Sequence, residues 1–361
     1  MLERNIVMTD DSMHYFDDIK VGKWARIDPA FHGAMEFCQQ WLNGGTSFTL
    51  KTSGSTGPPK DITVSREQMI LSARATKSFL KLRKGCRMIC CLNTDMIAGK
   101  MMLVRAMEWE ALIYLIKPSS VLLPPFPKAW ADFIALVPLQ LQASLENKSA
   151  KGFLEKIGTI IIGGAPVSPE LREKARRLPG KIYQTFGMTE TVSHIAMADL
   201  KAEGPLVYKA LPRVNLKVDA AKKLIIEAPM SGYRRIKTQD VVDLIDNKTF
   251  IWKGRADFVI NSGGVKLFPD ELEAAINPYW RKYFPGKRFF ITSTDDPKLG
   301  ESVLLVCEKV SSKDPLIQPF LRTLHENIHP YWMPKSLLNV DKILLTPSGK
   351  IDKRATLKPF V

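Results

Sequence analysis

Two short and largely apolar runs, Met88–Leu92 and Gly158–Gly163, predict strands that are covered on both faces of a sheet. Helices are predicted between these strands and after them. Ser65–Gln68 is typical of a capping box, in which a serine hydroxyl and a glutamine amide satisfy free backbone groups at a helix start. Ser168–Pro169 predicts another helix start, with serine as the N-cap. Strands that alternate with helices indicate an α/β fold.

After Gly254 the pattern changes to that of a compact α+β unit. Its predicted strands and helices are a strand over Arg288–Ser293, a strand over Ser302–Cys307, a helix that begins at Pro269 and a helix over Ile317–Ile328. We therefore predict a large N-terminal domain over residues 1–256 and a small C-terminal domain over residues 257–361.

The composition favours a protein of the cytoplasm. Hydrophobic residues make up 45% of the 361 residues and charged residues 25%, which is ordinary for a globular protein. No apolar run reaches the 18 residues that a membrane span requires. The N-terminus mixes acidic and polar residues and does not resemble a secretory signal. The five cysteines include no C-x-x-C pair, so we expect reduced, buried thiols and no zinc site.

The formal net charge of +15 is compatible with nucleic acid, a membrane surface or anionic small ligands as partners. Nucleic-acid binders usually concentrate their basic residues, often beside stacking aromatic residues. Here lysine and arginine are spread along the chain. We therefore expect small-molecule ligands, with no nucleic acid and no membrane insertion, for a monomer or homodimer.

The stretch Thr52–Lys60, TSGSTGPPK, is rich in hydroxyl groups and glycine. A Walker loop needs a lysine directly after its last glycine, whereas two prolines follow Gly57 and block that geometry. The amides of Gly54–Gly57 can still form a concave anion site. An exposed Ser/Gly linker is the alternative.

Five further stretches follow this loop: Gly163–Pro166, Gln184–Glu190, Thr238–Asp240, Gly254–Glu273 and Thr346–Arg354. In this order, the six stretches resemble the signatures of the adenylate-forming (AMP-binding) superfamily, which includes acyl-CoA synthetases, adenylation domains of peptide synthetases and luciferases. The resemblance covers nearly the whole chain. It implies that a carboxylate is joined to the α-phosphate of ATP with release of pyrophosphate, and that the acyl group then passes to a thiol.

The resemblance also implies the parts of an ATP site with Mg²⁺. The phosphate loop would hold the β- and γ-phosphates through Thr52, Ser53, Gly54, Ser55, Thr56, Gly57 and Lys60. Glu190 would recruit Mg²⁺, a cation that prefers oxygen ligands, and Thr189 would donate its hydroxyl to the α-phosphate. Glu190 could also simply cap a turn.

The adenine and ribose would be bound by later stretches. Phe186 stands where the family usually has a tyrosine against the adenine, followed by Gly187, and the other side of the base would be lined by Gly163, Gly164, Ala165 and Pro166. Asp240 would accept both ribose hydroxyls, and Arg255 would contact the ribose or a phosphate. A core position for Phe186 and a surface position for Asp240 are the ordinary alternatives.

Lys350 resembles the family's mobile catalytic lysine, which would bridge the attacking carboxylate and the α-phosphoryl oxygens where charge builds in the transition state. The small domain would then rotate about a hinge at Asp257. After rotation the Asn261–Lys266 loop, with Ser262, Gly263 and Gly264, would shape the tunnel for coenzyme A (CoA). An ordinary hairpin turn is compatible with the same residues.

With a domain shortened at its start, the chain resembles the compact, Bacteroides-type o-succinylbenzoate–CoA ligases of menaquinone biosynthesis, above all in Gly187–Ala196. One departure is Asn93–Gly99, where many of these ligases carry a histidine. A substrate with two carboxylates needs an anchor for the one that does not react. Lys100, Arg105 and His194 are candidates by charge and location, although each could be an ordinary polar surface or helix position.

Two other functions stay open at this point. The chain could load an acyl or aminoacyl group onto a carrier protein, or it could be a non-catalytic nucleotide or nucleic-acid binder. The joint presence of Glu190, Asp240 and Lys350 favours catalysis.

Overall fold

The computed structural model describes residues 5–24, 26–51, 61–346 and 351–360. The chain divides into two compact units. The first contains Met1–Lys217, Ile225–Ile236 and Ile245–Ile251, and the second contains Val218–Leu224, Lys237–Leu244 and Trp252–Val361. The predicted division between residues 256 and 257 falls inside the second unit and stays a prediction.

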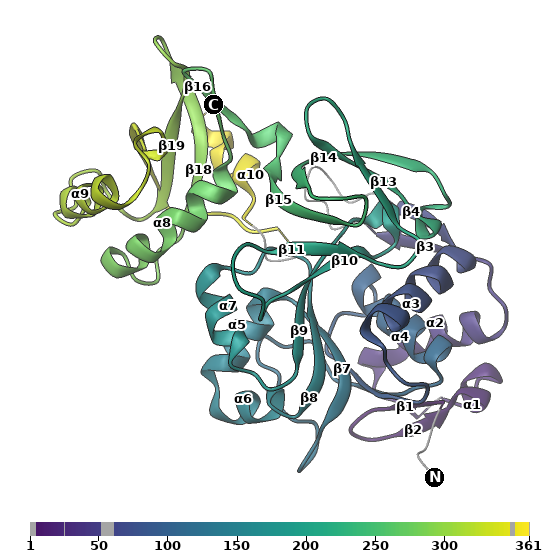
Figure 1. Ribbon diagram of the computed structural model, residues 1–361. Helices are drawn as coiled ribbons and strands as arrows, with labels where there is room; N and C mark the ends of the chain where they lie inside the picture. Colours follow the sequence, from purple (N-terminus) through teal and green to yellow (C-terminus); the bar gives the residue numbers. More distant parts are fainter. Residues whose placement is uncertain (1–4, 25, 52–60, 347–350, 361) are drawn as a thin grey trace. The chain divides into compact units, whose positions relative to one another are not determined.

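A parallel sheet forms the centre of the first unit (Figure 1). Its strands run parallel in the spatial order β1-β6-β5-β7-β8-β9, with β2 antiparallel at one edge and β10 and β11 continuing the sheet in antiparallel fashion at the other. The bounds are β1 Ile6–Met8, β2 Met13–Tyr15, β5 Arg87–Cys90, β6 Leu112–Leu115, β7 Ala131–Leu136, β8 Ile157–Ile162, β9 Lys181–Gly187, β10 His194–Asp199 and β11 Val207–Ala210.

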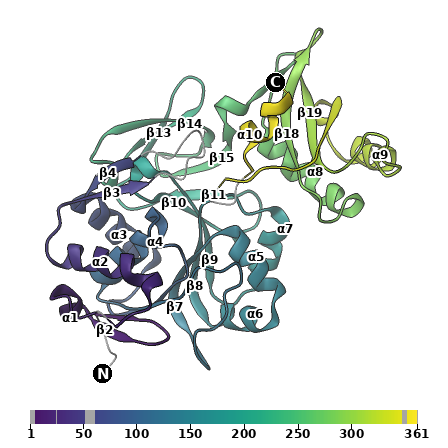
Figure 2. The same cartoon turned by 180° about the vertical axis from the view of Figure 1, so that it is seen from behind.

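Helices cover both faces of this sheet, as Figures 1 and 2 show from opposite sides. On one face, α5 (Pro138–Glu146), α6 (Lys148–Leu154) and α7 (Pro169–Arg176) pack against Ile134, Ile160 and Ile162. On the other face, α4 (Ile97–Trp109) contacts β7 through the rings of Trp109 and Phe133. The remaining helices of this part are α1 Phe16–Lys20, η1 Pro29–Phe31, α2 His32–Leu42 and α3 Arg66–Leu80.

The parallel order brings the carboxyl ends of several strands to one edge. In open α/β sheets, ligands bind beside this edge. The segments that leave it include the loop after β8, the turn after β9 and the stretch between β5 and α4. The first two carry residues that the sequence predicts for the site, and the third contains part of Asn93–Gly99, where the sequence departs from the family pattern.

The hairpin of β3 (Ser47–Lys51) and β4 (Asp61–Ser65) stands apart as a two-stranded antiparallel sheet. Its register pairs Ser47 with Ser65 and Lys51 with Asp61. The predicted phosphate loop, Thr52–Lys60, connects these strands and lies outside the described residues, so its role stays a prediction.

The next four strands after β11 have residues that are divided between the two units. They are β12 Asn215–Val218, β13 Lys223–Glu227, β14 Arg235–Leu244 and β15 Thr249–Arg255, with the short helix η3 at Pro229–Ser231.

The second unit has its own sheet and core. The strand order is β17-β16-β19-β18, and β20 pairs in parallel with β19. Trp280 of α8 and Phe320 of α9 meet edge to face in the core against this sheet. The bounds are η4 Ala256–Phe258, β16 Ile260–Ser262, β17 Val265–Leu267, α8 Pro269–Tyr283, β18 Phe289–Asp296, β19 Gly300–Glu308, α9 Ile317–Asn327, η5 Pro330–Trp332, β20 Ser336–Val340, α10 Lys353–Leu357 and η6 Lys358–Phe360.

These elements confirm the predicted α/β class and the α+β character of the C-terminal part. The capping box at Ser65 forms with both of its hydrogen bonds, and Ser168 accepts a hydrogen bond from the Leu171 amide. All five cysteines are buried and unpaired. Among the described residues, no helix is long and apolar enough to cross a membrane.

Candidate active site

The loop after β8 carries the predicted adenine-side residues Gly163, Gly164, Ala165 and Pro166. The Val167 amide donates to the Gln184 side-chain oxygen at 3.0 Å, and Thr185 Oγ1 donates to the Ile162 carbonyl at 3.1 Å. Both contacts tie the loop to β9. A β-carbon on Gly163 would lie 2.8 Å from Thr185 Oγ1, and Gly164 has φ = 88°, so both positions favour glycine.

Phe186 lies near the end of β9 and is only partly buried. Its ring meets Tyr208 and Phe250 at centroid separations of 5.7 and 5.1 Å, both edge to face. Tyr208 also accepts a hydrogen bond from the Gln184 amide at 2.6 Å. The aromatic residue is therefore anchored in a cluster, while part of its ring stays open for stacking.

A tight turn, η2 (Thr189–Thr191), joins β9 to β10. The Thr191 hydroxyl accepts from the Met188 amide at 3.2 Å and lies 2.8 Å from the Met188 carbonyl, which closes the turn. Val192 is buried with φ = 64°, a conformation that β-branched residues rarely adopt. A β-carbon on Gly187 would lie 2.4 Å from Cα of His194, so β9 and β10 approach closely here.

Glu190 is exposed on this turn and makes no ion pair with the described residues. In the same part of the chain, no group of three or more His, Cys, Asp or Glu side chains could hold a metal. Mg²⁺ usually keeps several waters and binds through one or two carboxylates together with substrate phosphates. A single free carboxylate on a rigid turn fits that mode.

A buried polar network connects α3, α4 and β10. Arg105 of α4 is only 2% exposed, and its Nη2 donates to Ser193 Oγ at 3.0 Å. Ser193 Oγ lies 3.3 Å from Nδ1 of His194, and Nε2 of His194 lies 3.0 Å from Thr76 Oγ1. The structure thus brings two of the three predicted acyl-site candidates, Arg105 and His194, into one cluster. Surface positions are wrong for both.

The charge state of this network follows from its burial. Burial lowers the pKa of Arg105 to about 10, which leaves the guanidinium charged at neutral pH. Burial, followed by the charge of Arg105, holds the pKa of His194 well below its ordinary 6.5, so the imidazole is neutral. Arg105 Nε has no hydrogen-bond partner, and no described carboxylate pairs with the guanidinium.

Lys100, the third candidate, lies near the start of α4 and is partly exposed. Its ammonium nitrogen is 5.8 Å from the ring centroid of Phe37. No hydrogen bond joins its ammonium to the Arg105 network, so the described hydrogen bonds favour Arg105 over Lys100 as an anchor.

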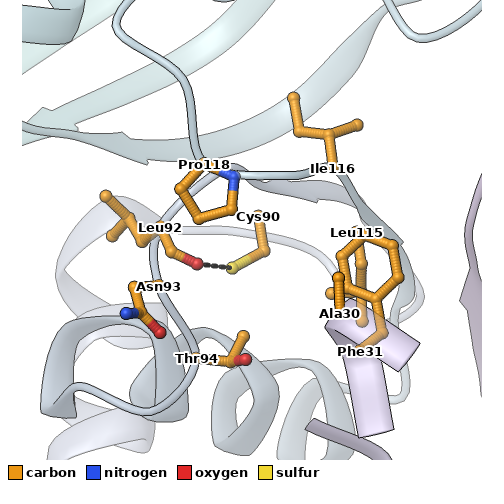
Figure 3. Close-up of a pocket in the computed structure, with 9 residues that line it drawn as sticks. All are labelled: Ala30, Phe31, Cys90, Leu92, Asn93, Thr94, Leu115, Ile116 and Pro118. Carbon is orange, nitrogen blue, oxygen red and sulfur yellow. Dashed lines mark hydrogen bonds between the residues drawn. The ribbon is translucent and has the colours of Figure 1, made fainter. Parts of the chain in front are cut away.

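A small cavity at the same edge of the sheet is lined by Cys90, Leu92, Asn93, Thr94 and residues that follow β6 (Figure 3). Its volume of about 30 Å³ has room for only a few waters. The Cys90 thiol donates to the Leu92 carbonyl at 3.7 Å. This cavity is too small for a nucleotide or an aromatic acid.

In the second unit, Asp240 of β14 is buried. The Trp252 indole N–H donates to Asp240 Oδ1 at 2.9 Å, and burial raises the pKa of this carboxyl. The predicted surface alternative for Asp240 is therefore wrong, while its ribose role stays a prediction.

Arg255 and Asp257 form a two-pronged ion pair. Nε and Nη2 of Arg255 donate to the two carboxylate oxygens of Asp257, each at 2.9 Å. Burial alone would raise the pKa of Asp257, but the hydrogen bonds and charge of Arg255 outweigh it and lower that pKa. Arg255, the predicted ribose or phosphate contact, is thus hydrogen-bonded to Asp257, the predicted hinge residue.

Ser262, Gly263 and Gly264 form the predicted hairpin turn. Ser262 pairs with Val265 across β16 and β17, and Gly263 and Gly264 have φ = 57° and 81°. The positive φ at both central residues is typical of a two-residue hairpin. Their CoA role stays a prediction. The role of Lys350 also stays a prediction, because this residue lies outside the described residues.

Several residues in these contacts were not singled out from the sequence. They are Thr76, Gln184, Ser193, Tyr208 and Trp252. Ser193 stands directly before His194, which is a weak signal. Thr76 lies on the buried side of α3, 118 residues from its histidine partner, and no local pattern marks that contact.

Comparison with known proteins decides the family. Residues 46–228, just over half of the chain, match the AMP-binding enzyme family. The chain belongs to this family. The AMP-binding family is the one that the ordered motifs predict, and the prediction is confirmed.

Relatives within the AMP-binding family agree on the kind of enzyme. The crystal structure of an acyl-CoA synthetase (AMP-forming)/AMP-acid ligase II-like protein from Dyadobacter fermentans is 37% identical, with 95% of this chain and 97% of that chain covered and a TM-score of 0.63. The 2-succinylbenzoate–CoA ligase of Listeria monocytogenes is 26% identical over 345 residues, 88% of this chain and 71% of the relative. The o-succinylbenzoate CoA synthetase (MenE) of Bacillus subtilis, solved with the acyl-adenylate OSB-AMP, shares the fold at 20% identity, with 85% of this chain and 68% of that chain covered and a TM-score of 0.68.

Proposed function

We propose that the chain is an AMP-forming acid–CoA ligase whose substrate is a dicarboxylic acid of the 2-succinylbenzoate kind. One carboxylate oxygen attacks the α-phosphorus of ATP, and pyrophosphate leaves. The CoA thiol then attacks the acyl carbon, and AMP leaves. With 2-succinylbenzoate the product is the CoA thioester used in menaquinone biosynthesis. The names of the relatives from Listeria and Bacillus support this substrate.

The observation that carries the proposal is the buried, unneutralised guanidinium of Arg105. A buried charge without a partner lowers the stability of the folded protein by roughly 3–5 kcal/mol. We therefore expect such a charge to be kept for a function, such as binding a ligand of opposite charge. A substrate carboxylate supplies that partner, and Arg105 offers donors in the planar arrangement that suits it.

The turn that follows β9 supports the adenylation step. Ser193, which contacts Arg105, is three residues after Glu190 and four after Thr189. Thr189 would donate to the α-phosphate and Glu190 would hold Mg²⁺, whose charge would offset that of the phosphates. Phe186 and the Gly163–Pro166 loop would contact the adenine.

The second unit would contain the ribose-binding residue, the catalytic lysine, the hinge and part of the CoA tunnel. Asp240 would accept the ribose hydroxyls, Lys350 would stabilise charge at the α-phosphorus, and Asp257 would be the hinge. The contact of Arg255 with Asp257 suggests that the arginine also holds the hinge in one conformation. The Ser262–Gly264 turn would line the CoA tunnel. We propose a cytoplasmic enzyme, monomeric or homodimeric, without nucleic-acid partners.

A panel of carboxylic acids with ATP and Mg²⁺ tests the proposal, with pyrophosphate release measured with and without CoA. The panel contains 2-succinylbenzoate, two analogues that each lack one of its carboxylates, and amino acids. We expect CoA-dependent turnover of 2-succinylbenzoate and much weaker turnover of the analogue that keeps only the reacting carboxylate. Release with amino acids would favour carrier-protein loading, and no turnover of any acid would favour a binding protein.

A further inference from the structure

We propose that Thr76, His194 and Ser193 form a directed chain of hydrogen bonds that positions Arg105 for the second carboxylate of the substrate without neutralising its charge. This inference rests on the proposed function for the identity of the bound carboxylate. The hydrogen bonds among these four residues are seen in the structure whatever the substrate is.

The direction of each hydrogen bond follows from the protons available. Thr76 Oγ1 donates its proton to the Ser72 carbonyl at 3.0 Å. Its contact with Nε2 of His194 can therefore be made only if that nitrogen donates. The neutral imidazole then carries its proton on Nε2 and accepts at Nδ1.

The other end of the chain follows in the same way. Nδ1 of His194 accepts the proton of the Ser193 hydroxyl at 3.3 Å. Ser193 Oγ is then free to accept from Nη2 of Arg105 at 3.0 Å. Each of the four hydrogen bonds between the Ser72 carbonyl and Nη2 of Arg105 therefore has one donor and one acceptor. The series begins at the backbone of α3, which holds Thr76 in place.

The hydrogen bond to Ser193 holds one edge of the guanidinium, and the other donors have no strong acceptor. Arg105 Nε has no partner and is buried, and Nη1 has only the weak acceptor Met102 Sδ at 3.7 Å. An aspartate in place of Ser193 would orient the arginine more strongly, but it would also cancel the charge that attracts the substrate. A neutral chain orients the group and preserves its charge.

The groups around His194 are consistent with this role. Burial and the charge of Arg105 lower the pKa of His194, and its hydrogen-bonding partners Thr76 and Ser193 are neutral. A protonated His194 would place two buried positive charges together. The neutral imidazole therefore helps to fix the orientation of the Arg105 guanidinium and does not act as an acid or a base.

A matched set of threonine variants tests the positioning role. Thr76→Val removes the hydroxyl and keeps the shape, and Thr76→Ser keeps the hydroxyl. Thr159→Val changes a buried threonine of β8 that takes no part in this series of hydrogen bonds, and it is the control for the loss of a buried hydroxyl group. For Thr76→Val we expect the KM for 2-succinylbenzoate to rise about 3- to 10-fold, the range expected for one lost hydrogen bond. The KM for ATP and kcat stay close to wild type, and Thr76→Ser restores the KM.

Equal KM values in Thr76→Val and wild type would overturn the positioning role while the proposed function stands. If Thr76→Val does not fold, Ser193→Ala and Ser193→Thr replace it as the pair. Nitrogen-15 NMR of the His194 side chain is independent of the substrate. We expect a neutral ring with the proton on Nε2 at neutral pH even if the wild-type protein adenylates no acid in the panel. A charged ring, or a proton on Nδ1, would overturn the directed chain.

Discussion

Arg105 combines burial, charge and the lack of a described carboxylate partner. Helix α4 is buried nearly all round between Met101 and Met107, so the arginine has no solvent face on which to lie. The guanidinium is therefore held in the interior, where burial lowers its pKa to about 10 and still leaves it charged at neutral pH. Because such a residue is costly for the folded protein alone, we propose that it binds an anion.

Arg105→Met should therefore separate stability from substrate binding. Losing one partner of a buried charge pair costs about 2–5 kcal/mol, so the KM for 2-succinylbenzoate should rise by about 30-fold or more. The melting temperature should not fall, because an apolar side chain of similar volume replaces an unpaired charge. Steady-state kinetics and thermal unfolding measure the two effects. A large loss of stability with an unchanged KM would make the arginine structural.

His194 predicts a pH dependence of stability. The folded protein keeps this imidazole neutral, whereas the unfolded chain takes up a proton as the pH falls below about 6.5. The unfolded state then binds more protons, so the stabilisation is complete above the unfolded pKa and is lost as the pH falls through it. Urea unfolding of wild type and His194→Gln between about pH 7.5 and 5 measures this.

We expect the difference in free energy of unfolding between wild type and His194→Gln to shrink as the pH falls. All other titrating groups are common to the two proteins, so their contributions largely cancel. A difference that is constant over this range would show that His194 has the same pKa in the folded and unfolded protein, and a difference that grows as the pH falls would show that the folded protein keeps it protonated.

Among neighbouring elements, the approach of β10 to the end of β9 fixes both the Glu190 turn and the Arg105 network. Gly187 pairs with His194 at the point where the register of the two strands shifts. A side chain at Gly187 would meet the backbone of Ser193 and His194. We therefore propose a coupling, in which a shift of the strands at this point displaces both the Glu190 turn and the Arg105 network.

Gly187→Ala should force the two strands apart. Overpacking of this kind costs about 1–3 kcal/mol, and a displacement of roughly 1 Å at the site can lower activity about 100-fold. Gly152→Ala in α6 is the control, since nothing lies within 4 Å of the added β-carbon and the helix should gain about 0.5–1 kcal/mol. Thermal unfolding and pyrophosphate release check both. Similar stability and activity in the two variants would refute the coupling.

The elements were largely predictable because their signals are local. The apolar run at Gly158–Gly163 corresponds to β8, and the Ser65 capping box forms at the start of α3. Ser262–Gly264 forms the hairpin that its glycines predict. The burial of Arg105 could not be predicted in this way, since it depends on α3 and β10 covering the helix. The contact between Thr76 and His194 likewise exists only in the folded chain.

At the scale of the whole molecule, we propose that the first unit binds the carboxylate and that Lys350 catalyses its activation. The described part of the C-terminal segment is anchored, because Lys353 binds Glu273 at 2.7 Å and the Ile291 carbonyl at 3.0 Å. The small domain would therefore carry Lys350 with it when it rotates.

Lys350→Ala should suppress adenylation far more than thioester formation, by about 100- to 1,000-fold if the ammonium stabilises transition-state charge. Pyrophosphate–ATP exchange measures the first half-reaction, and CoA thioester formation from supplied acyl-adenylate measures the second. Equal damage to both half-reactions would contradict a lysine that serves only the first.

The most direct test of acyl-adenylate chemistry follows oxygen from the acid. The wild-type protein is given 2-succinylbenzoate labelled with ¹⁸O in its carboxylates, together with ATP, Mg²⁺ and CoA, and the nucleotide product is examined by mass spectrometry. Attack of the carboxylate on the α-phosphorus predicts AMP that carries one ¹⁸O atom, with unlabelled pyrophosphate. Unlabelled AMP, or ADP with labelled phosphate, would contradict the account.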